Sequence, residues 1–334
     1  MNPVAFPSAL ERTDTPVASA VREGLCNHPK RLPPWLFYDS EGSRLFDEIT
    51  QLPEYYLTRT ERGIFLAEGQ NIITQAAGND GQVRLRIAEL GAGSADKTRL
   101  LLKAAVERQG DVVYEPVDVS ETALEVARER IEKEIPGVAV SPRVLDYMQG
   151  LELEPTEDGE RRLVLYIGSS IGNFEPHEAA RLLKGVRQGL AVGDALLLGV
   201  DLKKDEATLL AAYDDAAGVT ARFNLNVLAR LNRELGGDFD LGAFAHRAVW
   251  NEGQSRMEMH LESVCAQRVR LEALESNALE FEVGFAEGER IHTENSYKYA
   301  PGQAEAMLSA AGFEPDSTWT DERGWFAVCL GRAR

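Results

Sequence analysis

The sequence predicts an α/β fold in which a doubly wound parallel sheet carries a second, inserted α+β domain. Three observations lead to this prediction. Short apolar runs alternate with longer helical patterns in the middle of the chain, long helical patterns take over near Lys204, and the C-terminal residues return to the first arrangement. The expected domains are a discontinuous sheet domain of residues 61–202 and 299–334, and a second domain made of an N-terminal arm, 1–60, and residues 203–298.

The expected parallel sheet takes its strands from five apolar runs. These are Arg84–Glu89, Val112–Asp118, Ala139–Val144, Arg162–Ile167 and Ala195–Val200. Helical patterns lie between them, and each opens on acidic or hydroxyl residues that suit a helix start. The expected helices are Lys97–Arg108, Glu121–Glu134 and Glu175–Leu190.

The second domain is expected to combine helices with antiparallel strands. A long, largely helical stretch runs over Lys204–Leu235, and Val249–Phe285 then alternates as antiparallel strands do. Within the latter range, Met257–Leu261 fits a strand or a helix. The chain then closes the sheet domain with a helix and two strands, at Ala304–Ala311, Glu314–Trp319 and Phe326–Leu330.

Composition excludes several classes of partner. The 334 residues carry a formal net charge of −18, and no basic run offers the clustered Lys and Arg that bind a phosphate backbone. No segment approaches the ~18 consecutive apolar residues of a membrane span. We therefore expect neither nucleic acid nor a membrane as partner, and we expect a monomer.

The N-terminus and the cysteines favour a cytoplasmic location. The first residues lack the basic start and apolar run of a secretion signal. Cys26, Cys265 and Cys329 have neither the even count of a disulfide framework nor the paired spacing of a zinc site. The five histidines also lack metal-ligand spacing, so no metal is expected.

The sharpest local signal is the glycine turn within Ile87–Lys97, where the first strand passes into the first helix. Ligands of open parallel sheets bind at such junctions. The third glycine of a dinucleotide fingerprint is replaced by Asp96, which disfavours a pyrophosphate. Glu89 before the turn suits the cationic methionine portion of S-adenosylmethionine, and Asp118 is placed to accept both ribose hydroxyls. The pair resembles the first two motifs of the Rossmann-like class I methyltransferases.

Two later strand ends extend this pattern. Asp146 and Tyr147 follow the third strand, where Asp146 fits either an adenine contact or a helix cap. The fourth strand leads into Gly168–Asn173, whose small residues permit close approach and whose Asn173 offers both a donor and an acceptor at the carboxyl edge of the sheet. We expect substrate and cofactor to meet there.

Further segments, rich in aromatic residues and turns, make the resemblance more specific. Five segments, Leu32–Thr50, Leu52–Glu61, Ala211–Thr220, Phe223–Leu228 and His292–Tyr299, together resemble the histidine Nα-methyltransferases of ergothioneine biosynthesis. The resemblance extends from about Leu32 to Leu330. It implies that the sheet domain binds the cofactor and that the other domain binds the substrate.

The resemblance also implies a role for individual residues. The cofactor contacts would be Tyr38, Gly91, Lys97, Asp118, Asp146 and Tyr147. The amino and carboxylate groups of the amino acid would be held by Tyr55, Gly168, Asn173 and Tyr213. Glu294 and Ser296 would bind the imidazole, and Met259 would line its pocket. Tyr38, Gly168 and Asn173 would accept the hydrogen bonds of the reacting amine.

The assignment of Glu294 and Ser296 has a physical basis of its own. Residues two apart on a strand share a face, and a carboxylate and a hydroxyl satisfy both ring nitrogens of a neutral imidazole. From the residues alone, the alternative is a solvated Glu and Ser on an edge strand. Tyr55 and Met259 likewise fit ordinary core packing.

The implied reaction is the S-adenosylmethionine-dependent trimethylation of the α-amino group of free L-histidine to hercynine, the first step of ergothioneine biosynthesis. Two alternatives stay open. One is N-methylation of another aromatic amino acid, such as tyrosine or tryptophan. The other is a catalytically silent S-adenosylmethionine-binding protein.

Overall fold

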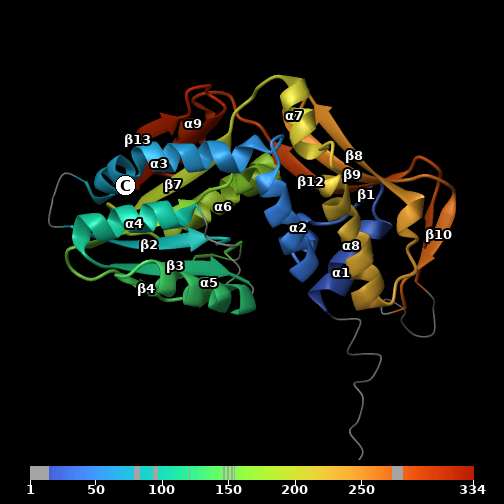
Figure 1. Cartoon of the computed structure of the whole chain (residues 1–334), viewed down its shortest axis with the longest axis horizontal. Coiled ribbons are helices and arrows are strands. Elements are labelled where there is room, and N and C mark those ends of the chain that lie inside the picture. Colours follow the sequence, from blue (N-terminus) through green and yellow to red (C-terminus); the bar gives the residue numbers. More distant parts are fainter. Residues whose placement is uncertain are drawn as a thin grey trace, which may run out of the picture. The chain divides into compact units, whose positions relative to one another are not determined.

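The computed structural model describes residues 15–78, 83–92, 97–119, 121–145, 147–148, 150–151, 153, 155–272 and 281–334. The chain divides into two compact units (Figure 1). The first unit contains the described residues up to Tyr56 together with Asp205–Ser296, and the second contains Leu57–Lys204 and Tyr297–Arg334. That the second unit binds cofactor and the first binds substrate stays a prediction.

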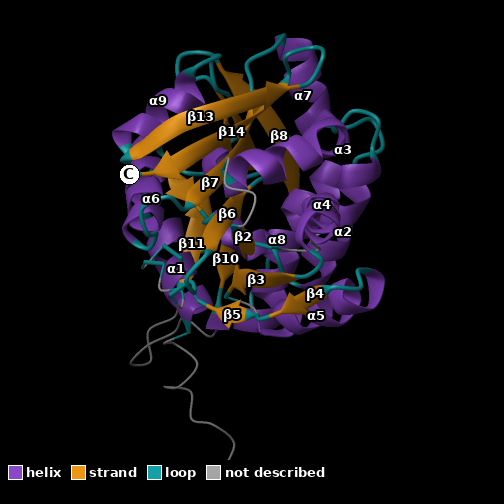
Figure 2. Cartoon of the chain, turned by 90° about the vertical axis from the view of Figure 1, so that its left-hand side faces the viewer, coloured by secondary structure: helices purple, strands orange, loops and turns teal. Residues whose placement is uncertain are grey.

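The second unit is built on an eight-stranded sheet with the order β13-β14-β7-β6-β2-β3-β4, in which β5 also pairs with β3 (Figure 2). The neighbours from β7 to β4 are parallel, and β14 runs antiparallel to both β7 and β13. The predicted α/β fold is therefore confirmed. The strands are β2 (Arg84–Leu90), β3 (Val112–Asp118), β4 (Val138–Val140), β5 (Arg143–Val144), β6 (Glu160–Tyr166), β7 (Ala195–Asp201), β13 (Phe313–Thr320) and β14 (Phe326–Ala333).

One predicted strand of this sheet is wrong in its length. The apolar run Ala139–Val144 forms β4 and β5 instead of one strand. Pro142 lies between them, and a proline has no N–H to donate to a ladder of hydrogen bonds. The prediction overlooked this interruption.

Helices cover both faces of the sheet, because its strands alternate between two hydrophobic clusters. Leu85 and Ile87 of β2 belong to a cluster with residues of α3, α4 and α5. Ala88 and Leu90 belong to a second cluster with residues of α6 and α9. Every residue of the central strand β7 is buried, as expected for a strand covered on both faces. The helices are α3 (Tyr56–Ala77), α4 (Thr98–Gln109), α5 (Glu121–Glu134), α6 (Pro176–Gln188) and α9 (Gln303–Ala310), with a short 3-10 helix, η3, at Ser170–Asn173.

The first unit contains a four-stranded sheet with the order β1-β12-β9-β8 and a separate β10-β11 pair. The ambiguous range Met257–Leu261 lies in β9, where every second residue is buried as in a half-covered strand. The strands are β1 (Lys30–Arg31), β8 (Phe244–Asn251), β9 (Arg256–Ser263), β10 (Gln267–Arg270), β11 (Glu282–Phe285) and β12 (Arg290–Tyr297). The helices are α1 (Pro16–Cys26), α2 (Ser40–Gln51), α7 (Glu206–Tyr213) and α8 (Val219–Leu235), with 3-10 turns η2 (Pro34–Phe37) and η4 (Leu241–Ala243).

The helical stretch predicted over Lys204–Leu235 forms two helices, α7 and α8. Asp215 separates them, since its carboxylate accepts hydrogen bonds from the backbone N–H groups of Val219 (2.9 Å) and Thr220 (2.7 Å). Gly218, with φ of +69°, provides the left-handed turn before α8. The break places Tyr213 at the C-terminal end of α7.

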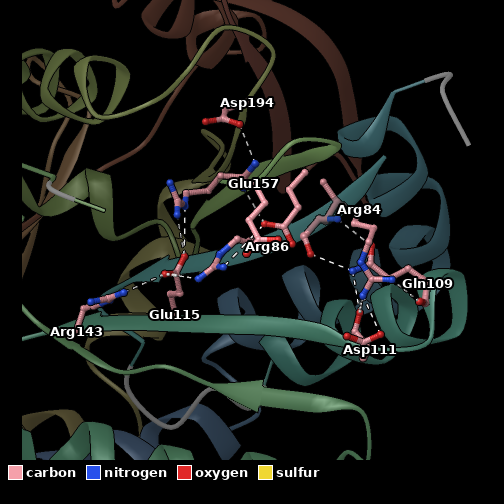
Figure 3. Close-up of polar contacts among 11 residues, drawn as sticks. Arg84, Arg86, Gln109, Asp111, Glu115, Arg143, Glu157 and Asp194 are labelled. Atoms are coloured by element: carbon pink, nitrogen blue, oxygen red, sulfur yellow. Dashed lines mark hydrogen bonds and ion pairs between the residues drawn. The ribbon is translucent and has the colours of Figure 1, made fainter. Parts of the chain in front are cut away.

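A layer of charged residues lies within the parallel sheet of the second unit (Figure 3). Glu115, in the middle of β3, is fully buried and pairs with Arg86 of β2 (3.2 Å), Arg162 of β6 (3.2 Å) and Arg143 of β5 (3.6 Å). Figure 3 shows Arg86 and Arg143 pointing toward Glu115 from opposite sides. One carboxylate on β3 therefore contacts three other strands of the sheet.

We expect the Glu115→Ala variant to lower the free energy of unfolding by about 3–5 kcal/mol, because it leaves buried guanidinium groups without their counter-ion. Urea unfolding followed by circular dichroism measures this. Glu125→Ala is the control, since Glu125 forms an exposed pair with Arg128 on α5 and should change stability by less than about 1 kcal/mol. If the two substitutions lowered the free energy of unfolding equally, the buried ion pairs of Glu115 would not stabilise the sheet as expected.

Candidate functional site

Three predicted cofactor residues meet at the carboxyl edge of β2 and β3. The backbone N–H of Gly91 donates to the Val117 carbonyl (2.9 Å), which places Gly91 beside the end of β3 and Asp118. The φ of Gly91 is +67°, and a Cβ at this position would lie 3.6 Å from the Tyr147 hydroxyl. This edge is where open parallel sheets bind ligands. The Asp118 carboxylate and the Tyr147 phenol, beside a glycine without a side chain, fit the ribose hydroxyls of S-adenosylmethionine.

Part of the predicted cofactor site lies outside the described residues. This applies to Asp146 and to residues 93–96 of the glycine turn. Their predicted roles stay predictions, as do those of Gly91, Asp118 and Tyr147.

Glu89, just before the glycine turn, has a structural task that the sequence did not reveal. Its carboxylate is buried and accepts hydrogen bonds from the hydroxyls of Thr98 (2.7 Å) and Tyr114. Burial raises the pKa of Glu89 to about 7, against the opposing effect of these hydrogen bonds. Glu89 thereby joins the first residue of α4 to β2 and β3.

Glu61 on α3 joins two of the predicted site residues, and the sequence analysis did not single it out. Both of its carboxylate oxygens accept a hydrogen bond from the Gly168 N–H, at 2.9 and 3.0 Å. The same carboxylate forms an ion pair with Lys97. A signal was present, because Glu61 shares the buried face of α3 with Ile64 and Phe65, at helical spacing.

The loop after β6 has a strained backbone and close packing. Gly168 and Ser169 have φ of +80° and +59°, both in the left-handed region. The Ser169 hydroxyl accepts a hydrogen bond from the Asp201 N–H (2.9 Å), and a Cβ on Gly172 would lie 2.9 Å from the Tyr297 carbonyl oxygen. The small residues therefore allow close approach of the chain to itself. Asn173 ends η3 and is half-buried.

Two predicted site tyrosines of the first unit contact one phenylalanine. Tyr38 packs edge-on against Phe46 at 5.9 Å between ring centroids, and Tyr55 does so at 6.1 Å. Phe223 of α8 also lies 6.0 Å from Phe46. Tyr38 stays exposed by 47%, which suits a contact with a ligand, and the sequence analysis did not identify Phe46 as its partner.

The predicted imidazole residues are buried in the first unit. Glu294 and Ser296 are 9% and 4% exposed, and their strand β12 lies between β1 and β9. The alternative of a solvated pair on an edge strand is therefore wrong. The Tyr213 hydroxyl donates to the Ser296 hydroxyl (2.7 Å), so two predicted substrate residues meet. Met259 of β9 is 2% exposed, and its proposed place in the pocket stays a prediction.

A buried histidine supports Tyr213, and the sequence analysis assigned it no specific role. His246 Nε2 donates to the Tyr213 carbonyl (2.8 Å), while its Nδ1 accepts from the Asn224 amide nitrogen (2.9 Å). The Asn224 amide oxygen in turn accepts from the Thr293 hydroxyl (2.8 Å). These bonds define one tautomer of a neutral imidazole. They connect the end of α7 to the middle of β12.

We expect acid to destabilise the protein through His246. Burial, opposed by the hydrogen bond to the Tyr213 carbonyl, lowers the pKa of His246 below its usual value. The unfolded chain then binds a proton that the folded chain does not, so this contribution is present above about pH 6.5 and is lost as the pH falls. Thermal unfolding from pH 7.5 to 5 measures it. The His246→Gln variant should lose less stability than the wild type over this range; an identical loss would contradict the assignment.

The described residues contain neither a metal site nor a membrane-spanning helix. Over the residues that the structure describes, no group of His, Cys, Asp and Glu side chains is arranged to hold a metal ion. Over the same residues, no helix is long and apolar enough to cross a bilayer.

Comparison with known proteins identifies the family. Residues 17–333 match the family described as histidine-specific, S-adenosylmethionine-dependent methyltransferases. The chain belongs to this family. The match extends over almost the whole chain, through both units, and confirms the resemblance inferred from the motifs.

Individual relatives of this histidine-specific methyltransferase support the assignment to the family. The chain is 46% identical to a histidine N-alpha-methyltransferase of Mycolicibacterium smegmatis, over 93% of this chain and 92% of that protein. It is 43% identical to the protein of that name from Mycobacterium tuberculosis, over the same shares. It is also 31% identical to ergothioneine biosynthesis protein 1 of Neurospora crassa, over 92% of this chain and 34% of that longer protein.

Proposed function

We propose that the chain transfers methyl groups from S-adenosylmethionine to the α-amino nitrogen of free L-histidine, three times in succession, to give hercynine. This would be the first step of ergothioneine biosynthesis. The relatives named above support the reaction. The observation in the structure that most supports the substrate is the buried pair Glu294 and Ser296, with the Ser296 hydroxyl held by Tyr213.

This pair suits an imidazole. Glu294 offers an acceptor for a ring N–H, and Ser296 offers a hydroxyl for the other ring nitrogen. An aliphatic amino acid bound in place of histidine would leave both polar groups unpaired, at a cost of about 1–3 kcal/mol for each buried group. Selection for histidine therefore depends on a penalty for other side chains as well as on attraction.

The reacting amine requires residues that keep it neutral and aligned. When bound, S-adenosylmethionine supplies a methyl group on a sulfonium. Tyr38, the Gly168 carbonyl and Asn173 are the proposed acceptors for the amine, and desolvation of the ammonium lowers its pKa. Tyr55 and Tyr213 are proposed to hold the remaining polar groups of the amino acid. Because no difficult proton transfer is needed, alignment of the nucleophile provides most of the acceleration.

The test of the reaction is mass spectrometry of the products formed from S-adenosylmethionine and an equimolar mixture of free amino acids. We expect trimethylated histidine as the only final product. A product that stops at the monomethyl stage would overturn the three-step reaction. Methylated tyrosine or tryptophan would overturn the substrate, and cofactor binding with no product would favour the catalytically silent protein.

For the imidazole pair, we expect the Glu294→Ala variant to raise the KM for histidine by roughly ten- to a hundred-fold, with little change in the Kd of S-adenosylmethionine. Steady-state kinetics and calorimetry measure the two constants. Glu282→Ala, on the exposed part of β11, is the control and should change neither. Equal losses in histidine and cofactor binding would mean that Glu294 does not bind the imidazole.

We further propose that the enzyme acts as a monomer in the cytoplasm. Cys26 and Cys265 are free and exposed, which fits a reducing compartment. Light scattering during gel filtration tests the monomer: a mass of 36.8 kDa is expected, and twice that mass would overturn it.

A further inference from the structure

A fully buried carboxylate lies at the centre of the second unit. Glu61 comes from α3, Lys97 precedes α4, and Gly168 follows β6, so Glu61 joins three segments that are distant in sequence. Glu61 is 0% exposed, while the side chain of Lys97 is 18% exposed. Lys97 thus pairs with a buried carboxylate while part of its own side chain stays exposed. A buried charge needs such a partner, because without one its desolvation is very costly.

The sheet beneath Glu61 leaves space for this carboxylate. A Cβ at Gly199 of β7 would lie only 2.2 Å from a Glu61 carboxylate oxygen. A Cβ at Gly168 would lie 3.1 Å from Lys97 Nζ. A side chain at Gly199 would therefore displace the Glu61 carboxylate, and one at Gly168 would crowd the Lys97 ammonium. This close packing around the Glu61–Lys97 ion pair distinguishes it from an ion pair on the exposed surface.

We propose that Glu61 is a positioning residue that fixes Lys97 and the Gly168 loop together and neutralises the Lys97 ammonium beside the proposed sites of the cofactor and the reacting amine. The inference deepens the proposed function, in which Lys97 contacts the cofactor and Gly168 contacts the reacting amine. Glu61 itself reaches neither ligand, because it is fully buried behind these two residues.

Two physical effects follow from the ion pair. Lysine has a long, flexible side chain, and a partner that immobilises it beforehand reduces the entropy lost when the cofactor binds. The second effect is electrostatic. A lone ammonium would repel the positive sulfonium, whereas an ammonium paired with Glu61 is compensated. S-adenosylhomocysteine has no sulfonium, so it should be much less sensitive to the charge of Glu61.

The experiment compares the two cofactor forms by isothermal titration calorimetry on the full chain. Glu61→Gln keeps a carbonyl acceptor for the Gly168 N–H but removes the charge. We expect the Kd of S-adenosylmethionine to rise roughly tenfold, and that of S-adenosylhomocysteine to rise several-fold less. Glu68→Gln is the matched control and should change neither Kd. Glu68 lies on the same helix, and its described hydrogen bond is an exposed one from Asn71.

Two further variants isolate the charge. The double variant Glu61→Gln/Lys97→Gln removes both charges, so the ratio of the two Kd values should return toward that of the wild type. Lys97→Gln alone leaves the carboxylate uncompensated and should shift the ratio in the opposite direction, in favour of S-adenosylmethionine. This last variant keeps the test decisive if Glu61→Gln does not fold, as judged by its thermal unfolding.

The proposal is overturned if Glu61→Gln weakens both ligands equally, since that result indicates a structural role only. It is also overturned if the Kd ratio does not respond to Lys97→Gln. These binding constants need no turnover, so they stay informative even if wild-type protein produces no methylated histidine. Failure of the proposed function and failure of this inference are therefore distinguishable.

Discussion

Helices cover the sheet of the second unit on both faces, and the rest of that unit depends on this constraint. Helices on the two sides leave no water to solvate a polar group that enters the sheet, so each such group must find a partner within the protein. Asp201, at the end of β7, shows the rule: it is fully buried and pairs with Lys298, itself fully buried, at 2.7 Å. Lys204 also pairs with Asp201. Glu115 follows the same rule among its arginines.

The same constraint explains why carboxylates hold the loops that form the candidate site. Glu89 binds the start of α4, and Glu61 binds the loop after β6 together with Lys97. A buried carboxylate can accept hydrogen bonds from more than one group: Glu89 accepts from two hydroxyls, and Glu61 accepts from the Gly168 N–H and pairs with Lys97. Gly168 and Lys97 are thus held by a carboxylate that lies beneath them.

The strands and helices of the second unit were predictable because periodicity reports burial, and burial decides these elements. The limits of β3 and α5 agree with the predicted residues, whereas the break at Pro142 was missed because the apolar pattern continues across it. Buried ion pairs were harder to predict. Arg86 and Glu115 alternate with apolar residues as solvent-facing charges do, and their partners come from strands that only the fold brings together.

The positions of single residues were predictable to different degrees. Gly91 and Asp118 could be placed from their positions at strand ends, since the carboxyl ends of adjacent parallel strands meet. The partner of Glu61, Gly168, and the partner of His246, Tyr213, could not be predicted, because each lies far away in the sequence. Phe46 is close to Tyr38 in the sequence, but no motif marks the contact between their rings. No motif singles out Glu61 or His246, and what marks them is the burial of a polar side chain.

The hydrogen bonds around Tyr213 have a direction, and that direction bears on the choice of substrate. His246 donates to the Tyr213 carbonyl, and the Tyr213 hydroxyl donates to Ser296. A serine hydroxyl that accepts one hydrogen bond can still donate its own proton in another direction. A donor at Ser296 and an acceptor at Glu294 match a neutral imidazole, which has one acceptor nitrogen and one N–H. Indole has only an N–H and phenol has a single hydroxyl, so neither offers two ring nitrogens to this pair. If Glu294 and Ser296 bind the imidazole as proposed, the chain of hydrogen bonds behind Ser296 would favour histidine over the other aromatic amino acids without any direct contact from His246.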